Sequence, residues 1–363
     1  MIAAAGLPLA LFFFATVEEA MKLAARGDFA GAEAELSTYL REQPRDADAH
    51  YRLGIVRMRR SDLDGAQAAL AEAVRIAPRL AIFHLAQGEL ELRRQNRRGA
   101  GEAAARAAGR AGEDASVWRG IAALQARAGD GLGQARSLQK IIELAPADRA
   151  AHVRLVTLFL EHRTADAAAA GAAAALAQFP DDAELLRLRG LAEYAAGRKP
   201  EAVRSFLASI DRAPDDEAGY ASLETLLPEA SVELMPDILK RLRPFAARNP
   251  LGAYLLALAA PVEAEAQLRR AIEQAPDFWP AQYELGRLLR DRGERTEAIV
   301  RLNRVLQLNP QHAESHYLLA QLEEDREQSR RHRAEHHRLR QEAARAERQR
   351  AAEKPRLAVK IDQ

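Results

Sequence analysis

The chain has 363 residues, of which 48% are hydrophobic and 29% charged, with 53 Lys and Arg against 52 Asp and Glu. This composition excludes a wholly disordered chain and a multispanning membrane protein, and the near-zero net charge gives no general reason to expect a nucleic-acid partner. The absence of cysteine rules out disulfide frameworks, thiolate metal sites and cysteine nucleophiles. Abundant alanine with only 5% aromatic residues favours closely packed helices over a β-sandwich or a β-barrel.

The amino end of the chain is a run without charged residues, from 2 to 17. It is short for a spanning helix, which needs about 20 residues, but its length suits the apolar region of a secretory signal. No Lys or Arg precedes the run, and the bulky Phe13 lies two residues before Ala15, the best cleavage point. We expect residues 1–16 to be a signal-like or membrane-tethering segment of an exported, bacterial protein. The alternative is that Leu9–Val17 forms the first buried helix of a cytoplasmic protein.

A period of 34 residues runs through the sequence. Prolines are separated by this step or by twice it at Pro44, Pro78, Pro146, Pro180 and Pro214, and again at Pro276 and Pro310. Small residues keep the same step at Gly54, Gly88, Ala122, Val156 and Gly190. Several independent sets of positions that share one period indicate an array of similar structural units.

Each unit has the pattern of two helices, as residues 47–80 illustrate. The second helix is expected to begin after Asp62, which can cap it, and to end at Pro78, because proline cannot donate the backbone hydrogen bond. Gly54 on the first helix and Ala66 on the second are expected to face each other. Small side chains there allow the two helix axes to approach to about 8 Å.

This pattern resembles the tetratricopeptide repeat (TPR) family, whose units have Leu-Gly, then Ala, then a bulky apolar residue, and finally Pro. The unit that ends at Pro310 has Leu285-Gly286, Ala298 and Leu302 in these places. The resemblance implies an all-α fold, a right-handed superhelical solenoid of stacked helical hairpins with a charged C-terminal helical tail. About nine units and a terminal helix fit between residue 13 and residue 325.

Two departures from the period divide the expected array. The unit after Pro214 contains Pro228, Pro236 and Pro244, where helices must break, shift or start. The next unit, from Pro250 to Pro276, is eight residues short. We therefore expect an N-terminal TPR array over 17–227, an irregular proline-rich junction with a shortened repeat over 228–262, C-terminal TPR units with a capping helix over 263–325, and a charged helical tail, fraying or disordered at its end, over 326–363.

The sequence contains no convincing catalytic constellation, and we expect no catalytic residue, no metal site and no cofactor. His332–His336 matches the H-x-x-E-H pattern of one group of zinc peptidases, but it lies in the charged tail without an evident third ligand. Gly129–Gly133 lacks the Lys-Ser/Thr pair of a phosphate-binding loop. The histidines at the fourth place of their units are interpreted as packing residues, since Trp118 and Tyr220 occupy the same place; they are His50, His84, His152 and His316.

The resemblance also implies where a partner would bind. In the family, the second, fifth, ninth and twelfth places of each unit line a concave groove formed by the first helices, and some of them are expected to pack instead. Apolar groups interrupted by arginines suit an extended or helical segment with apolar anchors and a few acids. These places are held by Tyr51, Ile55, Met58, Leu85, Glu89, Leu92, Arg119, Val153, Thr157, Leu160, Arg187, Leu191, Tyr194, Tyr283, Arg287 and Arg290.

The sequence therefore favours a non-enzymatic scaffold that holds a protein or peptide partner in this groove. No specific nucleic-acid partner is expected, and membrane contact is expected only through the amino-terminal segment. Two alternatives stay open: a cytoplasmic assembly or regulatory factor with the same fold, and an enzyme that uses the groove for its substrate. The last would need converging titratable groups with shifted pKa values. The sequence assigns no oligomeric state.

Overall fold

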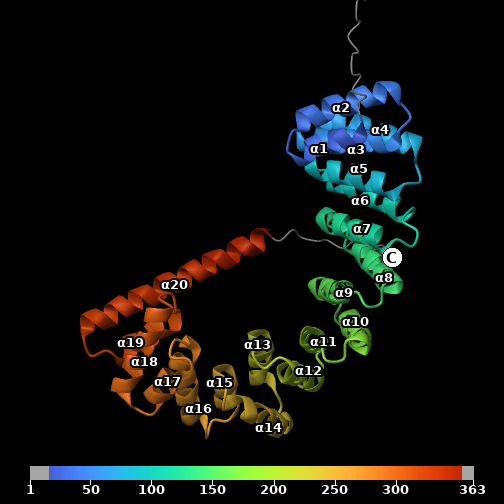
Figure 1. Ribbon diagram of the computed structural model, residues 1–363. Helices are drawn as coiled ribbons and strands as arrows, with labels where there is room; N and C mark the ends of the chain where they lie inside the picture. Colours follow the sequence, from blue (N-terminus) through green and yellow to red (C-terminus); the bar gives the residue numbers. More distant parts are fainter. Residues whose placement is uncertain (1–15, 354–363) are drawn as a thin grey trace, which may run out of the picture. The chain divides into compact units, whose positions relative to one another are not determined.

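The computed structural model describes residues 16–353, and this part of the chain is almost entirely helical (Figure 1). It contains twenty α-helices and two short 3₁₀ turns, and no strand occurs within it. The predicted all-α fold of stacked helical hairpins is thereby confirmed. In the same residues, no helix has both the length and the apolar character needed to cross a membrane. The predicted amino-terminal segment lies outside the described residues, apart from Thr16.

The chain divides into two compact units, Met1–Pro180 and Asp181–Gln363, while the sequence-based limits at 227 and 262 stay predictions. In the first unit, helices pack in consecutive pairs, and the second helix of each pair contacts the first helix of the next. The pairs are α1 (Val17–Ala25) with α2 (Phe29–Glu42), α3 (Ala47–Arg59) with α4 (Leu63–Ile76), α5 (Ala81–Arg93) with α6 (Arg97–Ala108), α7 (Ala115–Ala128) with α8 (Gly131–Leu144), and α9 (Arg149–Glu161) with α10 (Ala165–Gln178).

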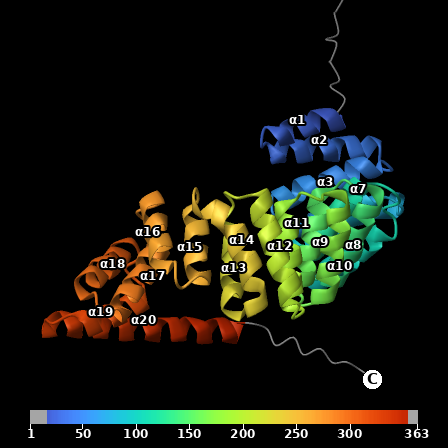
Figure 2. The same cartoon turned by 90° about the horizontal axis from the view of Figure 1, so that it is seen from below.

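The second unit follows the same plan with one irregular stretch (Figure 2). Its helices are α11 (Ala183–Ala195), α12 (Lys199–Arg212), α13 (Glu217–Leu226), α14 (Met235–Ala246), α15 (Pro250–Ala259), α16 (Ala264–Gln274), α17 (Trp279–Asp291), α18 (Arg295–Leu308), α19 (Ala313–Leu322) and α20 (Arg326–Glu353). Between α13 and α14 lie two 3₁₀ turns, Leu227–Glu229 and Val232–Leu234, and α14 packs mainly on α15.

The prolines of the irregular stretch affect the helices in two ways. Pro228 lies at the start of the first 3₁₀ turn, and Pro236 lies in the first turn of α14. A backbone N–H at these places has no partner within the helix, so proline loses no hydrogen bond there. Pro244 lies inside α14 and does not break it. The helix ends shortly afterwards at Ala246, so the distortion that proline causes is confined to the last turn.

Four consecutive hairpins of the first unit turn through the same cap. An Asp or Asn side chain accepts a hydrogen bond from the backbone N–H of the glycine three residues later, at 2.8–3.0 Å. The pairs are Asp28 with Gly31, Asp62 with Gly65, Asn96 with Gly99, and Asp130 with Gly133. A Cβ atom at Gly133 would lie 2.1 Å from Asp130 Oδ2, so the glycine leaves room for this orientation of the carboxylate. The glycine-rich run 129–133 spans the short connection from α7 and the first turn of α8.

The fourth residue of most units donates a hydrogen bond to the backbone carbonyl six residues earlier, usually that of the proline that ends the preceding unit. The donor–acceptor distances are 2.9–3.2 Å. Because a carbonyl can only accept, each imidazole here must carry its proton on Nε2. The residues concerned are His50, His84, Trp118, His152, Tyr220, Gln282 and His316. The bond explains why histidine is frequent at this place.

The small residues of the 34-residue period lie where the two helices of a hairpin touch. A Cβ atom at Gly54 would lie 2.6 Å from Leu70 Cγ, and one at Gly190 would lie 2.5 Å from the ring of Phe206. Phe206 is 1% exposed and is surrounded by the core of the second unit. Its ring therefore has little room to move aside.

We predict that Gly190→Ala destabilises the second unit by about 1–3 kcal/mol, because the new methyl group overpacks the α11–α12 contact. Gly101→Ala is the matched control, since nothing lies within 4 Å of a Cβ atom at this helical position. The control should be about 0.5–1 kcal/mol more stable than the native protein, because alanine has a higher helix propensity than glycine. Urea unfolding followed by circular dichroism measures both, and equal effects of the two substitutions would contradict the close approach at Gly190.

Candidate functional site

A pocket of about 270 Å³ lies on the face of the first unit that the first helices α3, α5 and α7 form. We call the surface formed by α3, α5, α7 and α9 the first-helix face. Four residues predicted from the sequence line the pocket together, Tyr51 and Ile55 from α3 and Leu85 and Glu89 from α5. The rest of the lining is Ile82, Ala86, Gly120, Ala123, Leu124 and Arg127.

The pocket is mainly apolar and contains one ion pair. Glu89 Oε1 accepts a hydrogen bond of 3.2 Å from Arg127 Nη2, and Arg127 Nη1 contacts the other carboxylate oxygen. The ring of Tyr51 stacks on Phe83 with the centroids 5.3 Å apart. Burial raises the pKa of the Tyr51 hydroxyl, so this group is uncharged at neutral pH. A ligand in this pocket would meet apolar walls, the Glu89 carboxylate and the Arg127 guanidinium that pairs with it.

A second pocket, of about 350 Å³, adjoins the first and lies among α7, α8 and α9. Ala123 lines both pockets, so α7 forms the ridge between them. Arg119, another predicted residue, lines the second pocket and donates to Asp148 Oδ2 from Nε at 3.0 Å and from Nη2 at 2.8 Å. Burial raises the pKa of Asp148, but the hydrogen bonds from Arg119 and from the backbone of Ala151 outweigh this effect and keep the pKa low.

The ridge on α7 presents Arg119, Ala123 and Arg127 at intervals of four residues, and all three side chains are exposed. Eight residues of helix separate the two arginines by about 12 Å along the axis. The floor beside the ridge is formed by small residues. At Gly120, a Cβ atom would lie 3.1 Å from Leu85, so the glycine keeps the first pocket open.

Other predicted residues of the first unit lie outside these two pockets. Val153 and Leu160 are half-buried on α9 and line neither of them. Met58 is 3% exposed and packs in a core cluster with Leu90, so the expectation that it lines a groove was wrong. Its place in the unit turns the side chain between α3 and α5 instead.

In the second unit, the predicted residues mostly contact neighbouring side chains. Leu191 and Tyr194 on α11 are half-buried against the core, and the Tyr194 hydroxyl donates to Glu229 at 3.0 Å. Tyr283 on α17 packs edge-on against His312, with the ring centroids 4.6 Å apart. Arg287 pairs with Glu284 at 2.7 Å, and Arg187 is half-buried on α11. Their role in partner binding stays a prediction.

Sequence reasoning missed part of the first pocket, notably Arg127 and Ile82. A signal for Arg127 was present, because Arg59, Arg93 and Arg127 are 34 residues apart. Arg93 Nε lies 4.0 Å from Glu89, so two members of this series surround the same carboxylate. The thirteenth place of these units therefore contributes to the face as well.

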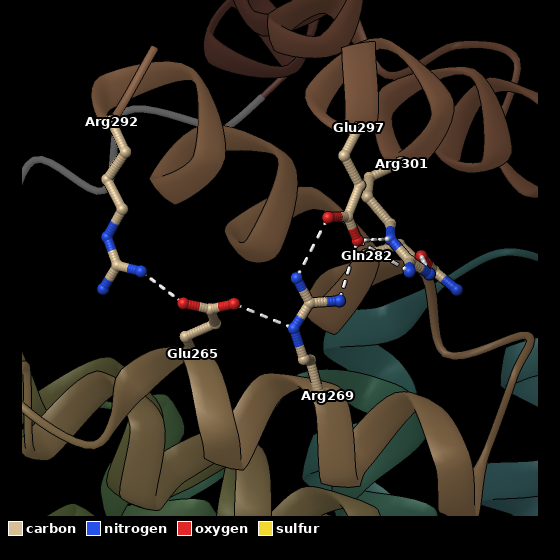
Figure 3. A network of polar contacts seen from close by, with 6 residues as sticks. All are labelled: Glu265, Arg269, Gln282, Arg292, Glu297 and Arg301. Carbon is tan, nitrogen blue, oxygen red and sulfur yellow. Dashed lines mark hydrogen bonds and ion pairs between the residues drawn. The ribbon is translucent and has the colours of Figure 1, made fainter. Parts of the chain in front are cut away.

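A separate cluster of charged side chains joins α16 to α18 in the second unit (Figure 3). Arg269 donates to Glu265 at 2.9 Å and to Glu297 at 2.7 and 3.0 Å. Arg301 also donates to Glu297, and Arg292 contacts Glu265. The hydrogen bonds from Arg269 and Arg301 lower the pKa of Glu297 to about 2. A carboxylate held ionised in this way suits an inter-repeat clamp and not a general acid.

We predict that Glu297→Gln lowers the stability of the second unit at pH 7 by about 0.5–1 kcal/mol, a value that allows for solvent screening of a partly exposed pair. Since the folded-state pKa lies below the ordinary 4.5, this contribution is complete above pH 4.5 and is lost as the pH falls towards 2. Urea unfolding at pH 7, 5, 4 and 3 should show that the free energies of unfolding of the native and variant proteins converge as the pH falls. Glu273→Gln, an exposed change on α16, should show no such trend.

Possible metal ligands are not gathered anywhere in the part of the chain that the structure describes. No group of three or more His, Asp and Glu side chains is arranged there to hold a metal ion. In the H-x-x-E-H segment, His332 contacts His316 on α19, and His336 lies against Tyr317.

Comparison with known proteins identifies the repeat. One model of the tetratricopeptide repeat matches residues 238–322, and another matches residues 17–81 and 153–217, together more than half of the chain. Among curated proteins, none matches the sequence.

Several solved structures are similar at low identity. The C-terminal part of a TPR repeat-containing protein from Cytophaga hutchinsonii is 12% identical, with 73% of this chain and 98% of that chain covered and a TM-score of 0.47. YrrB, described as a TPR protein with an unusual peptide-binding site, is 16% identical, with 52% of this chain and 97% of that chain covered and a TM-score of 0.41. PilF of Pseudomonas aeruginosa is 15% identical, with 58% of this chain and 95% of that chain covered and a TM-score of 0.38. Similarities of this size say nothing about function.

Proposed function

We propose that this chain, which belongs to the tetratricopeptide repeat family, is a non-enzymatic scaffold that holds a partner polypeptide on its first-helix face. The observation that carries the proposal is the pair of adjoining pockets, which meet at Ala123 and are lined by Tyr51, Ile55, Leu85 and Arg119. A partner would gain affinity in small increments from successive helices, as expected for a repeat array.

The chemistry of the face suits a segment with apolar side chains and acidic groups. Apolar residues of a partner can enter the two pockets, where burial of their surface is the main gain. The side chains of Arg119 and Arg127 remain 53% and 56% exposed although each pairs with a carboxylate. Asp148 engages Nε and Nη2 of Arg119, so the Nη1 donors are left to face a partner.

We predict that Ala123→Trp weakens partner binding by about tenfold or more, because the indole fills the place where the two pockets meet. A photo-crosslinking residue at Ile82, which lines the first pocket and is 44% exposed, would first identify and isolate the partner in cells. The affinity of the purified partner is then measured by calorimetry for the native protein and the variant. Ala71→Trp on the exposed side of α4 is the matched control and should bind like the native protein. Equal binding by all three proteins would refute the first-helix face as the site.

We further propose that residues 1–16 serve to export this protein from a bacterial cytoplasm. The uncharged run supports the proposal, and so does the start of the first helix. Thr16 is extended, with φ −129° and ψ 147°, and its Oγ1 accepts a hydrogen bond of 3.1 Å from the backbone N–H of Glu19. Thr16 is therefore the N-cap of α1, which begins at Val17. Cleavage after Ala15 would leave α1 and its cap intact.

We predict that the mature protein begins at Thr16 and is recovered outside the cytoplasm. Mass spectrometry of the amino terminus after cell fractionation measures this directly. Ala15→Phe should block cleavage and leave the protein attached to the membrane fraction, because the residue directly before the cleaved bond has to be small. An intact Met1 in the soluble cytoplasmic fraction would rule out export.

A further inference from the structure

The long charged helix α20 packs on α19 (Figure 2). A narrow row of its side chains faces α19. Ser329 is buried and its hydroxyl donates to the carbonyl of Ala320 at 2.7 Å. Leu339 is 7% exposed, and His332 and His336 are half-buried between them. The spacing of three, four and three residues puts these four side chains on one face of α20. Two of the four side chains are imidazoles.

The imidazoles of His316 and His332 meet through their Nδ1 atoms, which lie 2.8 Å apart. His316 Nε2 lies 3.2 Å from the carbonyl of Pro310 and must donate to it. In a neutral His316, Nδ1 is therefore an acceptor, and His332 Nδ1 is the donor. If both rings were protonated, two N–H groups and two positive charges would face each other across this distance. The docked arrangement thus excludes the doubly protonated pair.

Few charges near the two histidines would offset the repulsion between two protonated rings. His312, the N-cap of α19, would repel a proton on His316, and its ring packs against Tyr283 and Trp279 of α17. Glu323, just after α19, attracts a protonated His332. Glu335 on α20 faces His316, but Arg338 already pairs with it. On the side of α18, the pair meets the carbonyl of Pro310.

The next contact between α20 and α19 also involves an imidazole. The ring of His336 lies 5.3 Å from that of Tyr317, which is 49% exposed. At the next turn, Arg340 and Glu314 are 4.0 Å apart and both largely exposed, so this ion pair contributes little. The contact between α20 and α19 therefore depends on the imidazole row and on Ser329 and Leu339.

We propose that α20 is a pH-sensitive cap on the last repeat, docked on α19 while His316 and His332 share at least one neutral ring and released when both rings are protonated. The outer face of α19 is covered at neutral pH and becomes accessible in mild acid. The inference is independent of the function proposed for the first-helix face.

The direction of the effect follows from proton linkage. Burial lowers the pKa of His332, and the charge of His316 lowers it further. A histidine with a lowered pKa in the docked state favours docking above its ordinary value of 6.5, and this contribution is lost as the pH falls below that value. For each proton taken up on release, the docking constant is expected to fall by up to about tenfold per pH unit.

The absence of cysteine from the chain allows a distance measurement with two spin labels. Gln311→Cys and Ala334→Cys place the labels at exposed positions before α19 and on α20. One short, narrow distance is expected at pH 7.5, and a longer, broad distribution at pH 5.0. A second pair, Glu273→Cys on α16 with Asn303→Cys on α18, should keep its distance at both pH values. If the native protein keeps the short distance at pH 5.0, or if the second pair changes together with the first, the proposal is wrong.

Three substitutions test the histidine itself. His332→Gln keeps an N–H donor but does not titrate, so α20 should stay docked at pH 5.0. His332→Lys places a permanent charge opposite His316, so uptake of one proton should then suffice and α20 should be released at a higher pH than in the native protein. His337→Gln, an exposed change on the same helix, is the matched control and should behave like the native protein. Release of α20 at the same pH in His332→Gln and in the native protein would overturn the role of the pair.

Discussion

The hydrogen bond from the fourth residue of a unit to the loop after the preceding helix joins one repeat to the next. Proline stops that helix, and its own carbonyl lies just beyond the helix end. A side-chain donor from the following unit satisfies this carbonyl. Histidine, tryptophan, tyrosine and glutamine all serve, because the place requires only an N–H or O–H group at the right reach. Leu186, which holds this place after Pro180, has no donor, and the two compact units divide at that proline.

The fold could be predicted from the sequence because its period is carried by residues with local effects. Proline ends helices, and glycine or alanine allows close packing, whatever the rest of the chain does. The first pocket could be predicted in part, since Tyr51, Ile55, Leu85 and Glu89 follow from places within a unit. Arg127 could not be placed so easily, because its contact with Glu89 joins two different units. Met58 was misplaced because the exact rotation of α3 decides which side is buried.

Charged residues make up more than a quarter of the chain, and many of them form ion pairs with other residues of the array. Arginines at the fourteenth place of a unit reach back to the second helix of the preceding unit, as Arg60 does to Glu33 and Arg292 does to Glu265. Such pairs connect neighbouring hairpins and, being partly exposed, each adds little stability. The first-helix face therefore combines a stiff backbone arrangement with few available charges, and those of Arg119 and Arg127 gain importance for selectivity.

The caps of the first unit also bear on how the chain changes over evolutionary time. Asp28, Asp62, Asn96 and Asp130 with their glycines repeat at the same step as the helix-ending prolines and the interhelical donors. A segment of one period that is duplicated or deleted thus brings or removes a complete set of bonds, and its new neighbours meet matching partners. The array can therefore gain or lose whole hairpins in evolution while every ancestral form still folds. The length of the first-helix face changes with the number of hairpins.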